Sequence, residues 1–165
     1  MSALTTGKRA PDIQLPTTDG GQFSLPKALT RGPVLLVFFK ISCPVCQFAL
    51  PYVERLYRAA KGTNVTIVGI SQNLKKDSEF FARQYGITYP IALDDPNSYP
   101  VSNAYGITSV PTMFYVNQDG EIEVSGVGWS KADMENIAKK VAAQAQLGPI
   151  AVIKPGEDVP AFRAG

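Results

Sequence analysis

The sequence predicts an α/β fold, with a central mixed β-sheet and helices on both of its faces. Three observations lead to this class: apolar runs suited to buried strands alternate with segments of helical periodicity, two strands joined by a tight turn follow, and an amphipathic helix closes the series. The chain has 165 residues, of which 45% are hydrophobic and 18% charged. That is enough to build one domain with a proper core.

The first half of the chain contains a predicted hairpin and buried strands. Residues 11–24 alternate polar and apolar side chains around Asp19-Gly20-Gly21, which is typical of two antiparallel strands and their turn. Residues 32–40 and 64–71 are continuous apolar runs, as expected of strands that are covered on both faces. A shorter strand over 89–95 follows them.

Helical periodicity predicts two helices between these strands and a short irregular one after them. The segment 43–60 places its apolar residues at helical spacing, and Gly62 ends it. Pro51 lies inside this segment and predicts a kink, because proline lacks an N–H and its ring crowds the preceding turn. The second helix is expected over 75–86 and the short one over 98–106.

The C-terminal part of the predicted domain consists of two strands and a helix. Residues 111–129 are expected to form an antiparallel pair joined at Asp119-Gly120. Trp129 is interpreted as a core residue, with a position near the cysteines as the alternative. Residues 130–146 predict the final helix, with Ser130 as its N-cap.

One domain is expected over residues 1–147, followed by an extended C-terminal tail over residues 148–165. The tail contains three prolines and shows no clean period, so it is expected to be an extended arm or a frayed end. Neither internal repeats nor low-complexity segments divide the chain further.

Charge and composition argue against several classes of function. Sixteen basic and 14 acidic residues leave a net charge of +2 without a run of Lys or Arg, so binding to nucleic acid or to a membrane surface is not indicated. Glu54 and Asp77 are interpreted as exposed helix charges. The N-terminus lacks the apolar core of a secretory signal, and no run approaches the roughly 18 apolar residues of a spanning helix. We therefore expect a cytoplasmic protein, or a periplasmic one if a signal or anchor has been removed.

Both cysteines of the chain lie in the stretch Lys40-Ile41-Ser42-Cys43-Pro44-Val45-Cys46. The chain has no histidine, which excludes a Cys/His catalytic pair and a His-ligated metal within one chain. A disulfide between these cysteines closes too short a loop to remove much chain entropy. Redox exchange is the favoured interpretation, while half of an intermolecular metal site and a pair of ordinary buried thiols stay open as alternatives.

The position of the cysteines at a helix start suits thiol chemistry. If Cys43 opens the helix, unpaired N–H groups and the positive end of the helix dipole favour its thiolate. Pro44 fits the first helical turn, and Val45 joins it in influencing the redox potential. Cys46 lies three residues further on the same face, within reach of the first sulfur. We expect an exposed, attacking Cys43 and a shielded, resolving Cys46.

A second feature, Val110-Pro111, opens the strand that follows the short helix. Proline is tolerated at a strand start, and a cis X-Pro bond is a stable arrangement in a tight turn of this kind. An ordinary trans proline at a strand start is the alternative at this point.

Taken together, these features resemble the thioredoxin-like fold over residues 32–129. The features are a strand, the sequence CPVC at a helix start, Pro51 five residues after the second cysteine, and GITSVPT before the terminal hairpin. The N-terminal GKRAPDIQLPTTDGGQFSL and the insert SEFFARQYGITYPIALDDPNSYPVSNAYGI are more similar to the TlpA-like and AhpC/TSA (redoxin) branch than to minimal thioredoxin. The C-terminal tail lies outside the resemblance.

The resemblance implies a thiol:disulfide oxidoreductase. Cys43 would be the nucleophile, Cys46 the resolving cysteine, and Pro111 a cis-proline that keeps metal off the sulfurs. The backbone at Val110 would then be free to pair with an extended substrate. The expected redox group is the disulfide of the two cysteines, with no other cofactor and no metal. The expected partners are protein or small-molecule disulfides and dithiols, together with an upstream thiol reductant.

The sequence departs from its relatives around the cysteines. Ser42 replaces the Trp of many relatives, and Val37 replaces the buried Asp of thioredoxin, so the usual proton acceptor for the resolving cysteine is missing. Some TlpA-like relatives offer a carboxylate after the second strand, where this chain has Ser71, Gln72 and Asn73. Lys40 would favour the thiolate if it points toward the nucleophile, and a solvated strand-end lysine is the alternative.

Two other functions remain as alternatives. Peroxidases of the AhpC/TSA branch carry Pro and Thr seven and three residues before the peroxidatic cysteine, and this chain has Leu36 and Lys40 there. A peroxidase site would therefore lack its hydroxyl donor. The other alternative is a non-catalytic binding module that uses the sheet edge near Val110 and Pro111.

Overall fold

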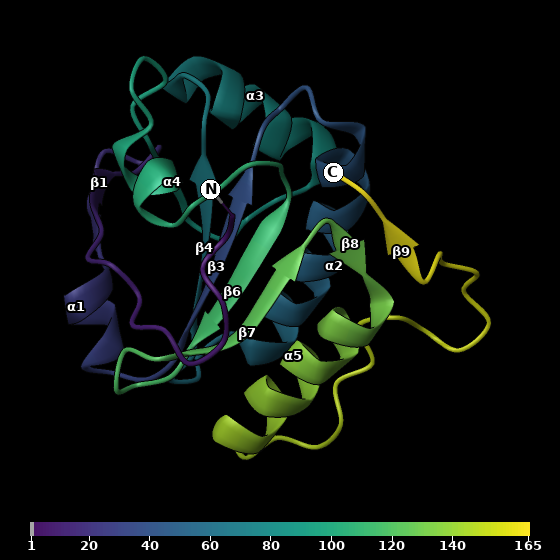
Figure 1. The fold of residues 1–165 in the computed structure, drawn as a ribbon. Coiled ribbons are helices and arrows are strands. Elements are labelled where there is room, and N and C mark those ends of the chain that lie inside the picture. Colours follow the sequence, from purple (N-terminus) through teal and green to yellow (C-terminus); the bar gives the residue numbers. More distant parts are fainter. Residues whose placement is uncertain (1) are drawn as a thin grey trace.

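The computed structural model describes residues 2–165 and contains a central five-stranded sheet between layers of helices (Figure 1). In chain order the elements are β1 (Gln14–Pro16), β2 (Gln22–Ser24), α1 (Leu25–Leu29), β3 (Val34–Phe39), α2 (Pro44–Ala60), β4 (Thr66–Ser71), α3 (Lys75–Tyr85), β5 (Ile91–Leu93), α4 (Pro100–Ala104), β6 (Thr112–Val116), β7 (Ile122–Val127), β8 (Trp129–Ser130), α5 (Lys131–Gln144) and β9 (Phe162–Arg163). The predicted α/β class is confirmed.

The sheet has the strand order β5-β4-β3-β6-β7. Strand β3 pairs in parallel with β4 and antiparallel with β6, while β4 pairs in parallel with β5 and β6 antiparallel with β7. The sheet is therefore mixed, as predicted. All six residues of β3 are buried, which explains why this strand reads as a continuous apolar run.

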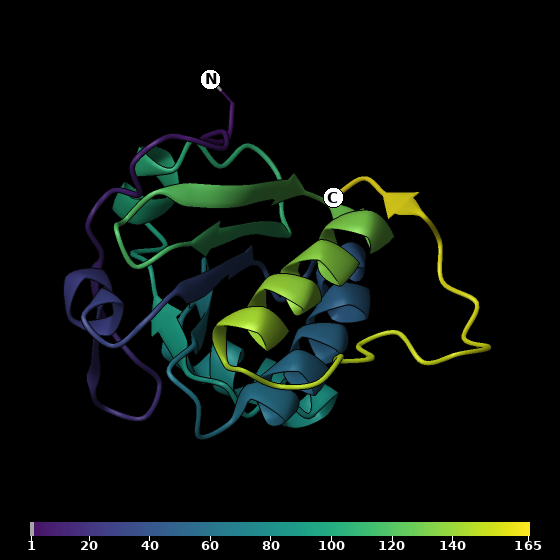
Figure 2. The same cartoon turned by 90° about the horizontal axis from the view of Figure 1, so that it is seen from below.

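Aromatic contacts show how the two faces of β3 are covered. Phe38 packs against Tyr105, which follows α4, at 5.2 Å between ring centroids. Its neighbour Phe39 points to the other face and packs against Phe81 of α3, also at 5.2 Å. Figure 2 shows α2, α3 and α5 on one side of the sheet and α4 with the N-terminal segment on the other.

The N-terminal hairpin is present, and it leads into a helix that the sequence reading missed. Strands β1 and β2 pair antiparallel with Gln14 opposite Ser24, as predicted for residues 11–24. The hydroxyl of Ser24 then accepts a hydrogen bond from Lys27 N and caps α1. This helix has only five residues and contains a proline in its first turn, so it carries no helical period long enough to recognise.

The two long helices flanking the site have the predicted bounds within a residue or two. Helix α2 begins at Pro44 with Cys43 as its N-cap, and it runs through Pro51 to Ala60. Whether Pro51 bends the helix stays a prediction. In α5, the Ser130 hydroxyl accepts a hydrogen bond from Asp133 N, so the expected N-cap is formed.

One predicted surface charge is buried. The sequence predicts Glu54 on the exposed face of α2, but its side chain is only 5% exposed. Its carboxylate accepts hydrogen bonds from the backbone N–H groups of Thr88 and Tyr89, and it pairs with Arg58. Glu54 therefore fixes the segment before β5 to α2. Asp77 is exposed on α3, as predicted.

The tail over residues 148–165 is extended and returns to the domain. The backbone carbonyl of Val152 accepts a hydrogen bond from Arg55, and Glu157 forms an ion pair with the same guanidinium at 2.6 Å. Strand β9 then pairs antiparallel with β8. The tail thus contacts α2 through Arg55, swings outward in a loop, and ends near the start of that helix (Figure 1).

Within residues 2–165, none of the helices combines the length and the apolar character needed to cross a bilayer.

Candidate active site

The two cysteines lie where β3 ends and α2 begins, at the carboxyl edge of the parallel strands β3 and β4. This is the place in an open α/β sheet where ligands usually bind. Cys43 has extended backbone angles, φ −86° and ψ 114°, and its Sγ accepts a hydrogen bond from Cys46 N at 3.2 Å. The first sulfur therefore acts as the N-cap of α2 and sits at the positive end of the helix.

The peptide bond between Val110 and Pro111 is cis, as the resemblance implies. The carbonyl oxygen of Val110 accepts a hydrogen bond from the Cys43 thiol at 3.3 Å. The loop before β6 and the start of α2 thus meet at this sulfur, although 67 residues separate them in sequence.

The two thiols differ sharply in their surroundings. Both are free cysteines, with Cys43 partly exposed and Cys46 fully buried. Burial raises the pKa of the Cys46 thiol well above its usual range, and the Cys43 side chain raises it further, while the backbone N–H of Lys40 acts in the opposite direction. Cys46 is therefore protonated at rest, and Cys43 is the sulfur that a substrate can reach.

The residues between the cysteines shape the first turn of α2. Pro44 stands at the first helical position and is exposed, so it costs the helix no hydrogen bond. Val45 is 8% exposed and packs in the core. Pro51 lies five residues beyond Cys46 inside the same helix and is partly buried.

Lys40 lies across a small polar pocket beside the cysteines. Its Nζ is 5.8 Å from the centroid of the Tyr99 ring. The pocket has a volume of about 150 Å³ and reaches from Lys40 to Val110. Its floor includes the buried residues Gln72 and Ser102, whose side chains are hydrogen-bonded at 2.9 Å. The sequence reading missed Tyr99 and Ser102, because their segment has no periodicity that points to the site.

Polar residues at the ends of β4 and β5 hold the cysteine loop and its neighbours. Asn73 Oδ1 accepts a hydrogen bond from Ile41 N at 3.0 Å, and Ser71 Oγ lies 2.6 Å from Ser78 Oγ. Asp94 is buried and accepts hydrogen bonds from the backbone and hydroxyl of Ser102 at 2.8 and 2.7 Å. These contacts hold α4 and the loop in place. Val37, at the position where thioredoxin has an Asp, is fully buried in β3.

An aromatic group that the sequence does not predict lies on α2 and β8. Phe48 follows Cys46 on α2 and packs edge-on against Trp129, with ring centroids 5.0 Å apart. Trp129 is fully buried, as predicted, and Tyr52 packs against it at 5.1 Å. Phe48 and Tyr52 are about one helical turn apart, and this spacing is the only signal in the sequence that could have grouped these two residues.

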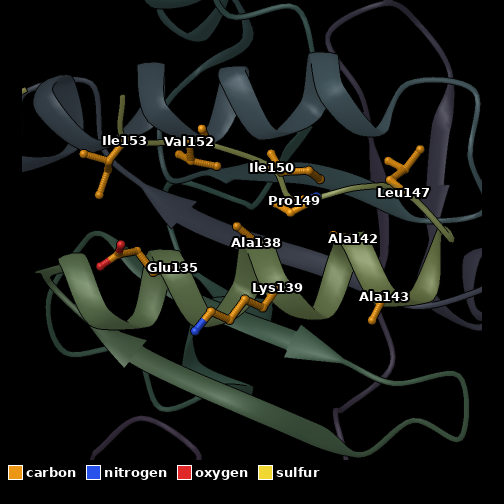
Figure 3. A pocket seen from close by; sticks show the side chains of 11 residues that line it. Glu135, Ala138, Lys139, Ala142, Ala143, Leu147, Pro149, Ile150, Val152 and Ile153 are labelled. Atoms are coloured by element: carbon orange, nitrogen blue, oxygen red, sulfur yellow. The ribbon is translucent and has the colours of Figure 1, made fainter. Parts of the chain in front are cut away.

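A separate pocket lies away from the cysteines, between α5 and the first part of the tail (Figure 3). It has a volume of about 470 Å³ and is lined mainly by apolar side chains, among them Ala138, Ala142, Ile150 and Val152. None of the predicted site residues lines it. Within residues 2–165, His, Cys, Asp and Glu side chains form no group of three or more that could hold a metal ion.

Comparisons with known proteins agree with this geometry. The model of the AhpC/TSA family matches residues 6–125. The thiol-disulfide oxidoreductase ResA of Geobacillus kaustophilus is 32% identical over 136 residues, which cover 81% of this chain and 76% of that protein.

Two solved structures are similar over most of the chain. A thiol:disulfide interchange protein of the thioredoxin family from Chlorobium tepidum has a TM-score of 0.68 at 29% identity and covers 86% of this chain and 99% of its own. The thioredoxin domain of a thiol-disulfide oxidoreductase from Bacteroides vulgatus has a TM-score of 0.73 at 25% identity, with 83% and 97% covered. The protein is accordingly a thioredoxin-like thiol:disulfide oxidoreductase, and its chain belongs to the AhpC/TSA family.

Proposed function

We propose that the protein exchanges disulfides with polypeptide substrates, with Cys43 as the nucleophile and Cys46 as the resolving thiol. One observation carries the assignment: Cys43 is the partly exposed N-cap of α2, whereas Cys46 is buried directly beneath it. A partly exposed thiol at a helix N-terminus can attack a substrate disulfide. The buried neighbouring thiol cannot reach the substrate, and it attacks the first sulfur only after a mixed disulfide has formed there.

The proposed exchange moves two electrons from the protein to its substrate. The Cys43 thiolate attacks one sulfur of the substrate disulfide, so that a mixed disulfide forms and the second substrate sulfur leaves as a thiolate, which takes up a proton. Cys46 then gives its proton to water and attacks the Cys43 sulfur, and the first substrate sulfur leaves as a thiolate that takes up a proton. The product is a Cys43–Cys46 disulfide and a substrate dithiol, and a thiol reductant regenerates the protein.

We propose that the substrate docks along the backbone at Val110 and Pro111. Pro111 is buried, and the Val110 carbonyl faces the attacking sulfur. An extended segment can pair with the backbone next to the attacking sulfur, since main-chain hydrogen bonds require no particular side chain. The reaction involves only the two sulfurs of the protein and needs no other cofactor.

Catalysed reduction of insulin disulfides by dithiothreitol tests the proposed function. We expect the protein to raise the rate above that of dithiothreitol alone, as measured by the turbidity of the precipitating B chain. A peroxidase would instead consume hydrogen peroxide at a catalytic rate, which we do not expect, because buried Leu36 and exposed Lys40 occupy the positions of its activating residues. Peroxide turnover without insulin turnover would reverse this choice.

A redox titration of the cysteine pair against glutathione gives the direction of exchange. Each shift of about 30 mV corresponds to about 1.4 kcal/mol for a two-electron couple, so the titration separates reductants from oxidants clearly. Because the proposed exchange reduces the substrate, we expect a potential below that of the glutathione pool. A potential near that of strong oxidants would contradict this direction.

A further inference from the structure

Residues 159–165 lie beside the proposed substrate path. Strand β9 pairs antiparallel with β8, with Trp129 opposite Arg163 and Ser130 opposite Phe162. Two further hydrogen bonds hold the approach to β9: Trp129 Nε1 donates to the carbonyl of Pro160 at 2.7 Å, and Lys131 N donates to that of Ala161 at 3.0 Å. This end of the chain is the yellow strand next to the start of α2 in Figure 1.

The segment continues past β9 to the cis-proline. Gly165 lies so close to Val110 that a Cβ atom on it would collide with the Val110 carbonyl oxygen. That oxygen is the one that accepts the hydrogen bond from the Cys43 thiol. The backbone of the tail thus reaches the atom that borders the attacking sulfur.

The contact surface is shaped for a closely approaching backbone. Gly128 has φ +78°, and a Cβ atom there would lie 2.5 Å from the carbonyl oxygen of Arg163. Only glycine accommodates both this backbone conformation and this neighbour without strain. Gly128 N also donates to the Pro111 carbonyl at 2.7 Å, so the same residue links the strand end to the cis-proline.

One side chain of the segment adds a specific contact. The guanidinium of Arg163 lies 5.2 Å from the centroid of the Phe48 ring, a distance at which a cation and an aromatic face attract each other. Phe162 points the other way and is 59% exposed. Upstream, the Arg55–Glu157 pair fixes the tail independently of these contacts, so residues 159–165 can leave the surface while the rest of the tail stays bound.

We propose that the strip formed by Phe48, Val110 and Gly128–Ser130, named here the docking strip, binds extended polypeptide substrates and is occupied in the free protein by residues 159–165. The inference rests on the proposed function, because it assigns the substrate of that same site. The tail shows which substrate segments fit: an extended backbone that pairs antiparallel with β8, a small residue beside Val110, and a cationic side chain over Phe48.

The tail competes with the substrate, because both bind the docking strip. Since the segment is tethered a few residues from Glu157, its effective concentration at the docking strip is in the millimolar range, as for other short linkers. A substrate then binds only the fraction of molecules whose strip is free, and its apparent affinity falls by that fraction. Small disulfides that touch only the Cys43 sulfur escape this competition.

A variant ending at Asp158 tests the proposal against the full chain. We expect its KM for insulin to be about tenfold lower, the factor expected if the tail covers the docking strip nine-tenths of the time. The rate of the Cys43 thiol with a small aromatic disulfide should be unchanged. Equal KM values in the two proteins, or a higher KM after truncation, would overturn the proposal.

Removing residues 159–165 also removes packing around Trp129, so point variants of the full-length chain provide a second test. Arg163→Ala removes the contact with Phe48 and should lower the KM for insulin about threefold, a partial version of the truncation. Phe162→Ala changes the neighbouring exposed side chain and serves as the matched control, with an unchanged KM. A response of Phe162→Ala equal to that of Arg163→Ala would contradict the assigned contact.

A binding measurement separates this proposal from the proposed function. The peptide VPAFRAG, which is residues 159–165, should bind the shortened variant and change the fluorescence of Trp129, the only tryptophan. S-carboxymethylated insulin B chain should displace it. If no variant turns over insulin, the proposed function fails while this displacement still decides whether the strip binds polypeptide. Absence of displacement would refute the docking strip even if insulin is reduced.

Discussion

Replacing Cys43 with Ser is expected to reduce catalysed insulin reduction to the rate of dithiothreitol alone. A hydroxyl does not replace a thiolate as nucleophile toward a disulfide, and Cys46 cannot take over, because it is fully buried and burial raises the pKa of its thiol. The fold should be retained, since oxygen can still act as the N-cap of α2. Insulin turbidity, with circular dichroism as the check of folding, measures both outcomes.

The variant Cys46→Ser supplies the matched comparison. It should still attack substrates through Cys43 but should fail to release them, so that mixed disulfides accumulate and appear as higher bands in non-reducing gels. The Cys43→Ser variant and the double variant should show no such bands. Equal accumulation in both single variants would contradict the assigned roles, because it would mean that either sulfur can reach a substrate.

The parts of the fold that could be predicted are those with strong local signals. Strand β3 is recognisable because both of its faces are covered, by Tyr105 on one side and Phe81 on the other, so every residue is apolar. The final helix is recognisable because Ser130 caps it and its apolar positions repeat. The five-residue helix α1 gave no such repeat and was missed.

Whether a charged residue is buried is harder to predict than where a helix begins and ends. Glu54 has the sequence neighbourhood of a solvated helix charge, yet it binds backbone groups more than 30 residues away. Asp94 is likewise buried, and its partners lie in α4. In both cases the deciding contact is made by a segment that is distant in the chain, and no periodicity reports it.

In the candidate active site, too, local features could be predicted from the sequence and distant contacts could not. The cysteines and the helix that positions them are local in sequence, and the resemblance supplied the cis-proline. The contacts around the cysteines could not be predicted from the sequence. Lys40 lies near the Tyr99 ring, Phe48 packs against Trp129, and the tail contacts Val110. Each of these contacts joins elements that only the completed sheet brings together. For a proline-rich tail without a period, the sequence therefore left an extended arm and a frayed end as alternatives, and the structure shows an extended arm that is hydrogen-bonded at several points.

The largest effect on stability is expected for Glu54→Gln. It should lower the free energy of unfolding by about 3 kcal/mol, because the buried carboxylate accepts several charge-assisted hydrogen bonds whose backbone donors would be left partly unsatisfied. The carboxylate accepts backbone hydrogen bonds from Thr88 at 2.7 Å and Tyr89 at 3.3 Å and pairs with Arg58 at 2.9 Å. An amide can satisfy only part of these donors. The melting temperature should fall by roughly 6–12 °C for a chain of this size.

Glu79→Gln, which breaks an exposed pair with Lys75, is the matched control and should change stability by less than about 0.5 kcal/mol.

The loss should also depend on pH. Burial opposes ionisation of Glu54, but the hydrogen bonds from Thr88, Arg58 and Tyr89 outweigh it and hold the pKa of the carboxyl below its usual range. A group with a depressed pKa stabilises the folded state above its unfolded pKa of about 4.3, and this contribution is lost as the pH falls through the lower folded value. The difference in melting temperature between wild type and Glu54→Gln should therefore be constant near neutral pH and shrink below about pH 4, where the glutamate itself becomes protonated. Thermal unfolding followed by circular dichroism between pH 3 and pH 7 measures it. A difference that stays the same across this range would show that packing, rather than the charge of Glu54, holds the segment before β5 to α2.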